Sequence, residues 1–144
     1  VRGKPGDELM PLLGWTGEHD WRGFVAHADL PKAFDPPDGL LISANHKVVD
    51  SRYYPHYLGQ TWKSGYRAQA IRHELLRLSE GGRKLSPKHM PEVLMNVRSW
   101  AAVDFVKELR DVRPEGDTEA ALAMLSAWDG ELRTDSVPAA LYQL

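Results

Sequence analysis

The chain has 144 residues, of which 42% are hydrophobic and 26% are charged, which is ordinary for a globular protein and excludes wholesale disorder. Its formal net charge is −2 and its basic residues are spread along the sequence, so no nucleic-acid partner is expected. No stretch approaches the roughly 20 apolar residues that cross a bilayer, so no membrane partner is expected, and the lack of cysteine excludes disulfides and thiolate chemistry.

Residues 1–64 are rich in proline and in turn-forming sequences, which predicts turns and short strands. The clearest strand is predicted over residues 39–45, a short apolar run that follows a Pro-Pro-Asp-Gly turn. Such a strand would deliver Asn45 to the edge of a sheet. Several aromatic residues gather here and either line an apolar cleft or form the packing core of a segment poor in regular structure: Trp15, Trp21, Tyr53, Tyr54, Tyr57, Trp62 and Tyr66.

Residues 65–144 have the apolar spacing of helices. The first helix is predicted to begin near Gly65 and to end at Gly81-Gly82. Ser86-Pro87 is typical of a helix start, and the apolar stripe that follows predicts one long, well-buried helix reaching about Val106.

Two further helices are predicted near the end of the sequence. One runs from Thr118 to about Trp128, with Asp117 or Thr118 as its cap. The last begins after Ser136, with a proline in its first turn, and has no stop signal. We therefore expect the chain to be an internal fragment, organised as a single domain over residues 1–144, in the α+β class with helix dominant and three to four helices.

The residue types exclude few enzyme classes but favour none. The six histidines form no HExxH pattern that would place two imidazoles on one helical face, so solvated or capping histidines are expected. No serine lies in a Gly-x-Ser-x-Gly turn, and Ser86 and Ser136 are predicted to be helix caps. A self-contained metal-dependent or triad enzyme is therefore disfavoured.

An ordered series of short motifs resembles the penicillin acylase family. The series comprises Gly14-Trp15-Thr16-Gly17, Asp20-Trp21-Arg22-Gly23, Leu30-Pro31, Asp35-Pro36-Pro37-Asp38-Gly39, Ile42-Ser43-Ala44-Asn45, Tyr57-Leu58-Gly59, Gly65-Tyr66-Arg67-Ala68, Asn96-Val97-Arg98-Ser99 and Trp128-Asp129-Gly130. Each piece is weak alone, but the pieces occur in the family's order and cover nearly the whole chain.

The resemblance implies an N-terminal-nucleophile amidohydrolase with a four-layer αββα fold, in which a serine's own α-amine acts as the general base. That serine opens the family's large chain, and we expect it to lie outside this segment, which alone is expected to be inactive. The implied partners are a small-molecule amide substrate, the remainder of the large chain and the small chain. The implied location is periplasmic or secreted.

Two site residues of the family match positions in this sequence. Asn45 matches the asparagine whose side-chain amide donates to the tetrahedral oxyanion, a contribution of about 3–4 kcal/mol to the barrier. Arg67 matches the arginine whose guanidinium holds that asparagine. Without the resemblance, Asn45 is more typical of a turn former at a strand end, and Arg67 of a solvated residue at a helix start. The residue directly after Asn45 is His46, where many members of the family carry a second asparagine.

The resemblance implies no catalytic cofactor, and the structural calcium of some family members is doubtful here. Its ligands there include a proline carbonyl near Pro11 and a carboxylate whose position is occupied by His56. Imidazole is a poor ligand for a hard cation, so the ion is not expected unless Asp50 substitutes. A helical aspartate of the family is likewise replaced by Asn96.

One alternative function stays open at this point. The apolar helical stripes and the missing nucleophile are also typical of a non-catalytic helical interaction or scaffold domain. Because strands of a larger sheet would lose their neighbours in this segment, we also expect exposed apolar edges and self-association.

Overall fold

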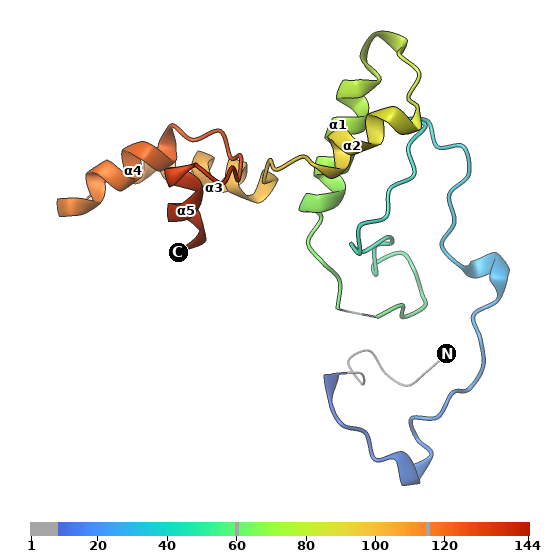
Figure 1. The fold of residues 1–144 in the computed structure, drawn as a ribbon. Coiled ribbons are helices and arrows are strands. Elements are labelled where there is room, and N and C mark those ends of the chain that lie inside the picture. Colours follow the sequence, from blue (N-terminus) through green and yellow to red (C-terminus); the bar gives the residue numbers. More distant parts are fainter. Residues whose placement is uncertain (1–8, 60, 115) are drawn as a thin grey trace. The chain divides into compact units, whose positions relative to one another are not determined.

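The computed structural model describes residues 9–59, 61–114 and 116–144. The chain divides into two units, Val1–Gly65 and Tyr66–Leu144. Figure 1 shows the first unit, drawn in blue to green, as loops and short turns, and the second as a set of helices. The predicted dominance of helix is confirmed, whereas the single-domain assignment and the αββα architecture stay predictions. In the described ranges, no helix is both long enough and apolar enough to cross a membrane.

In the described part of the first unit, the chain forms 3-10 turns at Gly14–Thr16 and His27–Asp29 and is irregular over most of the remaining residues. The strand predicted over residues 39–45 is not present: its residues are irregular, and Leu41 is largely exposed. Among the described residues the only pairing of this unit is an isolated parallel bridge between His46 and Lys63. An apolar run becomes a strand only where a neighbouring segment shares a ladder of backbone hydrogen bonds with it. In the described part of this unit the backbone bond to Lys63 comes only at Asn45, at the very end of the run, so no ladder forms along residues 39–44.

The second unit begins with helix α1, Tyr66–Leu78, which confirms the first predicted helix. The chain then forms a 3-10 turn at Glu80–Gly82, where Gly81 has φ +70°. Glycine adopts this left-handed conformation without the Cβ clash that other residues meet, so the Gly81-Gly82 pair ends the helix as predicted.

The long second helix predicted from Ser86 to Val106 is wrong, because two helices occupy this region. They are α2, Met90–Leu94, and α3, Trp100–Glu108. Between them Asn96 Oδ1 accepts a hydrogen bond from the backbone N–H of Arg98 at 2.8 Å, and Ser99 Oγ accepts one from Ala102 N at 3.2 Å. These short polar side chains bind the backbone locally and so compete with helix continuation.

The burial of this region also differs from the prediction. Leu94 and Met95 at the end of α2 are exposed, whereas Ala102 and Val106 of α3 are buried. The apolar stripe therefore belongs to two short helices with different surroundings, and only the second part lies in a core.

Helices α4, Glu119–Ser126, and α5, Val137–Gln143, confirm the last two predicted helices. Thr118 immediately precedes α4, and the Asp117 side chain lies outside the described part of the chain. Ser136 caps α5 as predicted, since its Oγ accepts a hydrogen bond from Ala139 N at 3.3 Å.

The core of the second unit lies between α3, α4 and α5. Its buried residues are Ala102, Val106, Trp128 and Ala139. Tyr142 of α5 joins two aromatic rings there, with centroids 5.4 Å from that of Phe105 and 5.4 Å from that of Trp128. Tilted ring pairs at this separation add to the apolar burial that holds the three helices together.

The turn after α4 is tied to the start of α3. Gly130 O accepts a hydrogen bond from Ser99 N at 2.8 Å, Leu132 N donates to Val97 O at 3.0 Å, and Arg98 and Glu131 form an isolated antiparallel bridge. Trp128 Nε1 donates to Glu131 O at 3.1 Å, which fixes the indole in the core. The Trp-Asp-Gly motif thus forms a structural junction.

A buried carboxylate lies between α1 and α2. Glu74 is only 7% exposed and accepts a hydrogen bond from Arg77 Nε at 2.9 Å. Arg77 Nη2 reaches Glu92 of α2 at 3.3 Å, and His73 Nδ1 lies 3.5 Å from the other Glu74 oxygen. The hydrogen bond to Glu74 is the main reason that the pKa of Arg77 is raised. Arg77 therefore connects α1 to α2 while compensating a charge held away from water.

We expect Arg77→Met to lower the urea concentration at which the chain unfolds, because it leaves the Glu74 carboxylate, which is only 7% exposed, without its guanidinium. Arg77 is itself half exposed, which limits the loss. The matched control is Arg133→Met, which removes a guanidinium from two more exposed carboxylates, Asp129 and Glu131, at an expected cost within about 0.5 kcal/mol. Urea unfolding followed by circular dichroism measures both, and equal losses would contradict a special role for Glu74.

Candidate functional site

Asn45 lies at the neck of a loop in the first unit. The backbone N–H of Lys63 donates to Asn45 O at 2.9 Å, and the bridge between His46 and Lys63 lies directly beside this bond. Residues 46–63 therefore form a loop whose two ends are held together. The preceding Ala44 is buried, and its N–H contacts His46 Nδ1 at 3.4 Å. The neck positions Asn45 through its backbone.

The backbone of Asn45 is left-handed, with φ +58°. Among residues other than glycine, asparagine adopts this conformation most readily, because its short side chain can bond locally. The Asn45 side chain is exposed rather than packed in a core. These facts are compatible with a turn residue, which needs the left-handed backbone, and with an oxyanion donor, which needs an exposed amide. Its role as an oxyanion donor stays a prediction.

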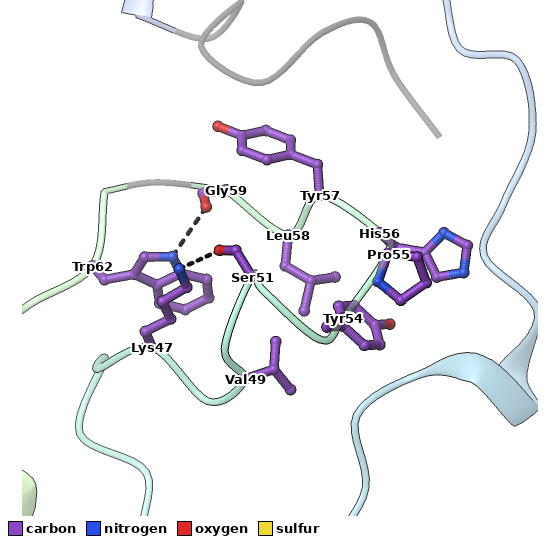
Figure 2. Close-up of a pocket in the computed structure, with 10 residues that line it drawn as sticks. All are labelled: Lys47, Val49, Ser51, Tyr54, Pro55, His56, Tyr57, Leu58, Gly59 and Trp62. Carbon is purple, nitrogen blue, oxygen red and sulfur yellow. Dashed lines mark hydrogen bonds between the residues drawn. The ribbon is translucent and has the colours of Figure 1, made fainter.

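The loop of residues 46–63 encloses a cavity of about 430 Å³. Figure 2 shows Val49 and Leu58 pointing towards each other across it, with the Trp62 indole at one side and Tyr54, Pro55 and His56 at the other. Trp62 Nε1 donates to Gly59 O at 3.0 Å, which fixes the indole. Tyr54 Oη donates to Asp29 O at 2.6 Å, which anchors the opposite wall.

Lys47 supplies the cationic group of this cavity. Its ammonium donates to the hydroxyl oxygen of Ser51, as Figure 2 shows. Neither residue is among the site residues predicted from the sequence. The sequence offers two weak signs of this cationic group. Lys47 and Ser51 are four residues apart, and residues 46–63 contain three basic residues but only one acidic residue.

The residues of this loop do not fit a structural calcium. Asp50, the candidate carboxylate, binds Arg52 through Nε at 2.8 Å and through Nη2, and accepts from Arg52 N at 2.9 Å. The hydrogen bond from the Arg52 side chain is the main reason that the pKa of Asp50 is lowered. His56 lines the same cavity as the Lys47 ammonium, which would repel a cation. Across the described residues, no three histidine or acidic side chains gather in a way that would hold a metal ion.

Arg67 lies in the second unit, in the first turn of α1, and its side chain is exposed. It borders a groove of about 560 Å³ between α1 and α2, together with Asn96. The floor of this groove is apolar and is formed by Ala70, Ile71, Met90, Val93 and Leu94. Asn45 and Arg67 thus belong to different units, and the predicted support of Asn45 by Arg67 stays a prediction.

The predicted aromatic cluster is divided. Tyr54, Tyr57 and Trp62 line the cavity of the 46–63 loop, in agreement with the cleft alternative. Trp15, Trp21 and Tyr53 are exposed, so their assignment to a packing core is wrong in this structure. Tyr66 belongs to α1 in the second unit.

Ser86 and His89 form a serine–histidine contact in the described part of the chain. Ser86 Oγ lies 3.2 Å from His89 Nδ1, but the same nitrogen accepts the backbone N–H of Ser86 at 2.9 Å. The ring therefore fastens the turn that begins at Pro87, and Ser86 precedes that turn as predicted.

Comparison with known proteins identifies the family. A family model described as Penicillin amidase matches residues 1–144. The chain belongs to the penicillin amidase family. A chain of this family is expected to show the ordered motifs found in the sequence, and the site positions Asn45 and Arg67 lie within the matched range.

Similar curated proteins carry two kinds of acylase name. The chain is 30% identical to the Penicillin acylase 2 proenzyme of Pseudomonas sp. (strain SE83), over 92% of this chain and 17% of that protein. It is 31% identical to acyl-homoserine lactone acylase QuiP of Pseudomonas putida and 30% identical to QuiP of Pseudomonas syringae, each over 98% of this chain and 18% of that protein. This penicillin amidase family chain therefore spans less than a fifth of the length of these relatives.

Proposed function

We propose that these residues are part of an amidohydrolase that cleaves linear amides through an acyl-enzyme on an N-terminal serine. The supporting observation is the family match over residues 1–144, together with relatives named as penicillin acylase and acyl-homoserine lactone acylase. The substrate class is an amide whose acyl group is the side chain of a penicillin or cephalosporin, or the acyl chain of an N-acyl-homoserine lactone.

The chemistry assigns a distinct step to each group. The serine α-amine takes the hydroxyl proton while the oxygen attacks the amide carbonyl, and the negative charge moves to the carbonyl oxygen. The Asn45 side-chain N–H donates to this oxyanion, and its rigid backbone at the loop neck keeps the amide in place. The Arg67 guanidinium donates to the amide oxygen of Asn45 and orients the donor. The tetrahedral intermediate collapses, the C–N bond breaks and the leaving amine takes the proton from the α-ammonium. Water then hydrolyses the acyl–serine ester, which releases the acid and restores the serine.

The remainder of the large chain and the small chain are the proposed partners of this segment, in a periplasmic or secreted enzyme. Large aromatic side chains of the first unit support a polypeptide partner: Trp15 is 83% exposed, Phe24 94% and Phe34 96%. Side chains of this size at such exposure are typical of surfaces that another part of a protein covers. The nucleophile is proposed to lie in this remainder, so the 144 residues alone are proposed to be inactive.

The test is an amidase assay on the full-length protein that contains these residues and on residues 1–144 alone, with a panel of chromogenic acyl amides. We expect turnover by the former and background hydrolysis by the latter, and mass spectrometry of the quenched full-length enzyme should find the acyl group on an N-terminal serine. Equal activity of the two proteins, or an acyl group on a serine within residues 1–144, would contradict the proposal.

A second candidate is a non-catalytic interaction domain, favoured by the apolar groove between α1 and α2, which Leu94 helps to line, and by the exposure of Leu94 and of the following Met95. The two candidates differ in the effect of Asn45→Ala on the full-length protein, since a substitution in a non-catalytic interaction domain should leave amide turnover unchanged.

A further inference from the structure

The cavity of the 46–63 loop combines apolar walls with one cationic group. Val49, Leu58 and Trp62 supply apolar surface, and Tyr54 and Pro55 extend it. None of the residues that line this cavity is acidic: Lys47, Val49, Ser51, Tyr54, Pro55, His56, Tyr57, Leu58, Gly59 and Trp62. Its volume of about 430 Å³ lies within the range of roughly 300–1,000 Å³ found for small-molecule sites.

The charge of the loop favours an anion. Residues 46–63 contain Lys47, Arg52 and Lys63 but only one acidic residue, Asp50, which gives a formal charge of +2 in a chain whose net charge is −2. Both Asp50 oxygens are engaged by Arg52, so the one carboxylate of this loop is already compensated by a cation other than Lys47. The Lys47 ammonium is held by Ser51 at the cavity wall, where it has further N–H donors to offer, since an ammonium carries three.

We propose that this cavity binds a small organic carboxylate with an apolar or aromatic body. The body lies against Val49, Leu58 and Trp62, and the carboxylate accepts hydrogen bonds from the Lys47 ammonium and the Ser51 hydroxyl. His56 at the opposite wall closes the site without adding a negative charge. Binding itself does not depend on the reaction. The acid released by amide hydrolysis belongs to this ligand class, and that link rests on the proposed function.

The test titrates the 144-residue chain with 4-phenylbutyrate and with its neutral amide, 4-phenylbutanamide, by calorimetry. We expect the carboxylate to bind at least about fivefold more tightly than the amide. Lys47→Met should remove this preference by weakening carboxylate binding to the level of the amide. Lys63→Met is the matched control, because it removes the same charge from the same loop at a residue that does not line the cavity. Its carboxylate affinity should stay within about twofold of the parent chain.

Leu58→Trp fills the cavity and should abolish binding of both compounds, while amide NMR spectra of all variants check that the chain stays folded. Equal affinity for acid and amide, an unchanged affinity of Lys47→Met, equal losses in the two lysine variants, or no carboxylate binding at millimolar concentration would each overturn the proposal. These readouts require no turnover, so they are independent of the amidase assay.

Discussion

On the proposed function, replacing Asn45 by alanine in the full-length protein should lower amide turnover by roughly 10²–10³-fold, the usual loss when one oxyanion donor is removed. The effect should appear in kcat rather than in KM, because the donor acts on charge that develops only in the transition state. Steady-state kinetics on a chromogenic acyl amide measure both constants. A rate within about threefold of the wild type would reduce Asn45 to a turn residue.

The left-handed backbone of Asn45 provides a sharper control. At φ +58° a Cβ costs about 1–2 kcal/mol, a strain that alanine keeps without the local side-chain bonding of asparagine and that glycine removes. Asn45→Gly removes the amide without this strain. If asparagine serves only the turn, glycine should restore activity. If the amide is the donor, Asn45→Gly should remain as slow as Asn45→Ala while unfolding at a higher denaturant concentration.

The features predicted correctly from the sequence depend on residues close together in the chain, whereas those predicted wrongly depend on distant partners or on competing side chains. Helices α1, α4 and α5 were predicted from apolar spacing and from the glycines and serines at their ends, all of which act within one or two turns. The predicted strand over residues 39–45 depended on a pairing partner that sequence spacing does not supply. The break between α2 and α3 was missed because Asn96 and Ser99 outweigh a continuous apolar stripe.

The candidate site shows the same division. Asn45 and Arg67 were found by resemblance to a family, since a lone asparagine after an apolar run and a lone arginine at a helix start have no specific chemistry of their own. The Lys47 cavity was missed because it exists only through the closure between Asn45 and Lys63, 18 residues apart. That closure brings Val49 and Leu58 together, and no periodicity in the sequence marks it.

Gly130→Ala should lower the free energy of unfolding of the second unit by about 2–4 kcal/mol, combining overpacking with left-handed strain. A Cβ at this position would lie 2.7 Å from Val103 Cγ2, 3.3 Å from Ser99 O and 3.4 Å from Val103 N, and Gly130 has φ +79°. Two of these three atoms belong to the backbone at the start of α3, which cannot rotate away as a flexible side chain would. Urea unfolding followed at 222 nm measures the loss.

Gly81→Ala separates strain from clash. Gly81 has nearly the same backbone, with φ +70°, but an added Cβ would meet no atom within 4 Å. Gly81→Ala should therefore cost only about 1–2 kcal/mol, the strain alone.

Adding Val103→Ala to the Gly130→Ala variant removes the closest clash, so the double variant should lose less than the sum of the two single losses. Equal losses at Gly81 and Gly130, together with strict additivity, would show that the Trp-Asp-Gly junction is not packed against α3. A larger loss at Gly130 than at Gly81, with a non-additive double variant, would show that a side chain does not fit at Gly130. The turn after α4 must approach the N-terminus of α3 closely enough for Gly130 O to accept the Ser99 N–H.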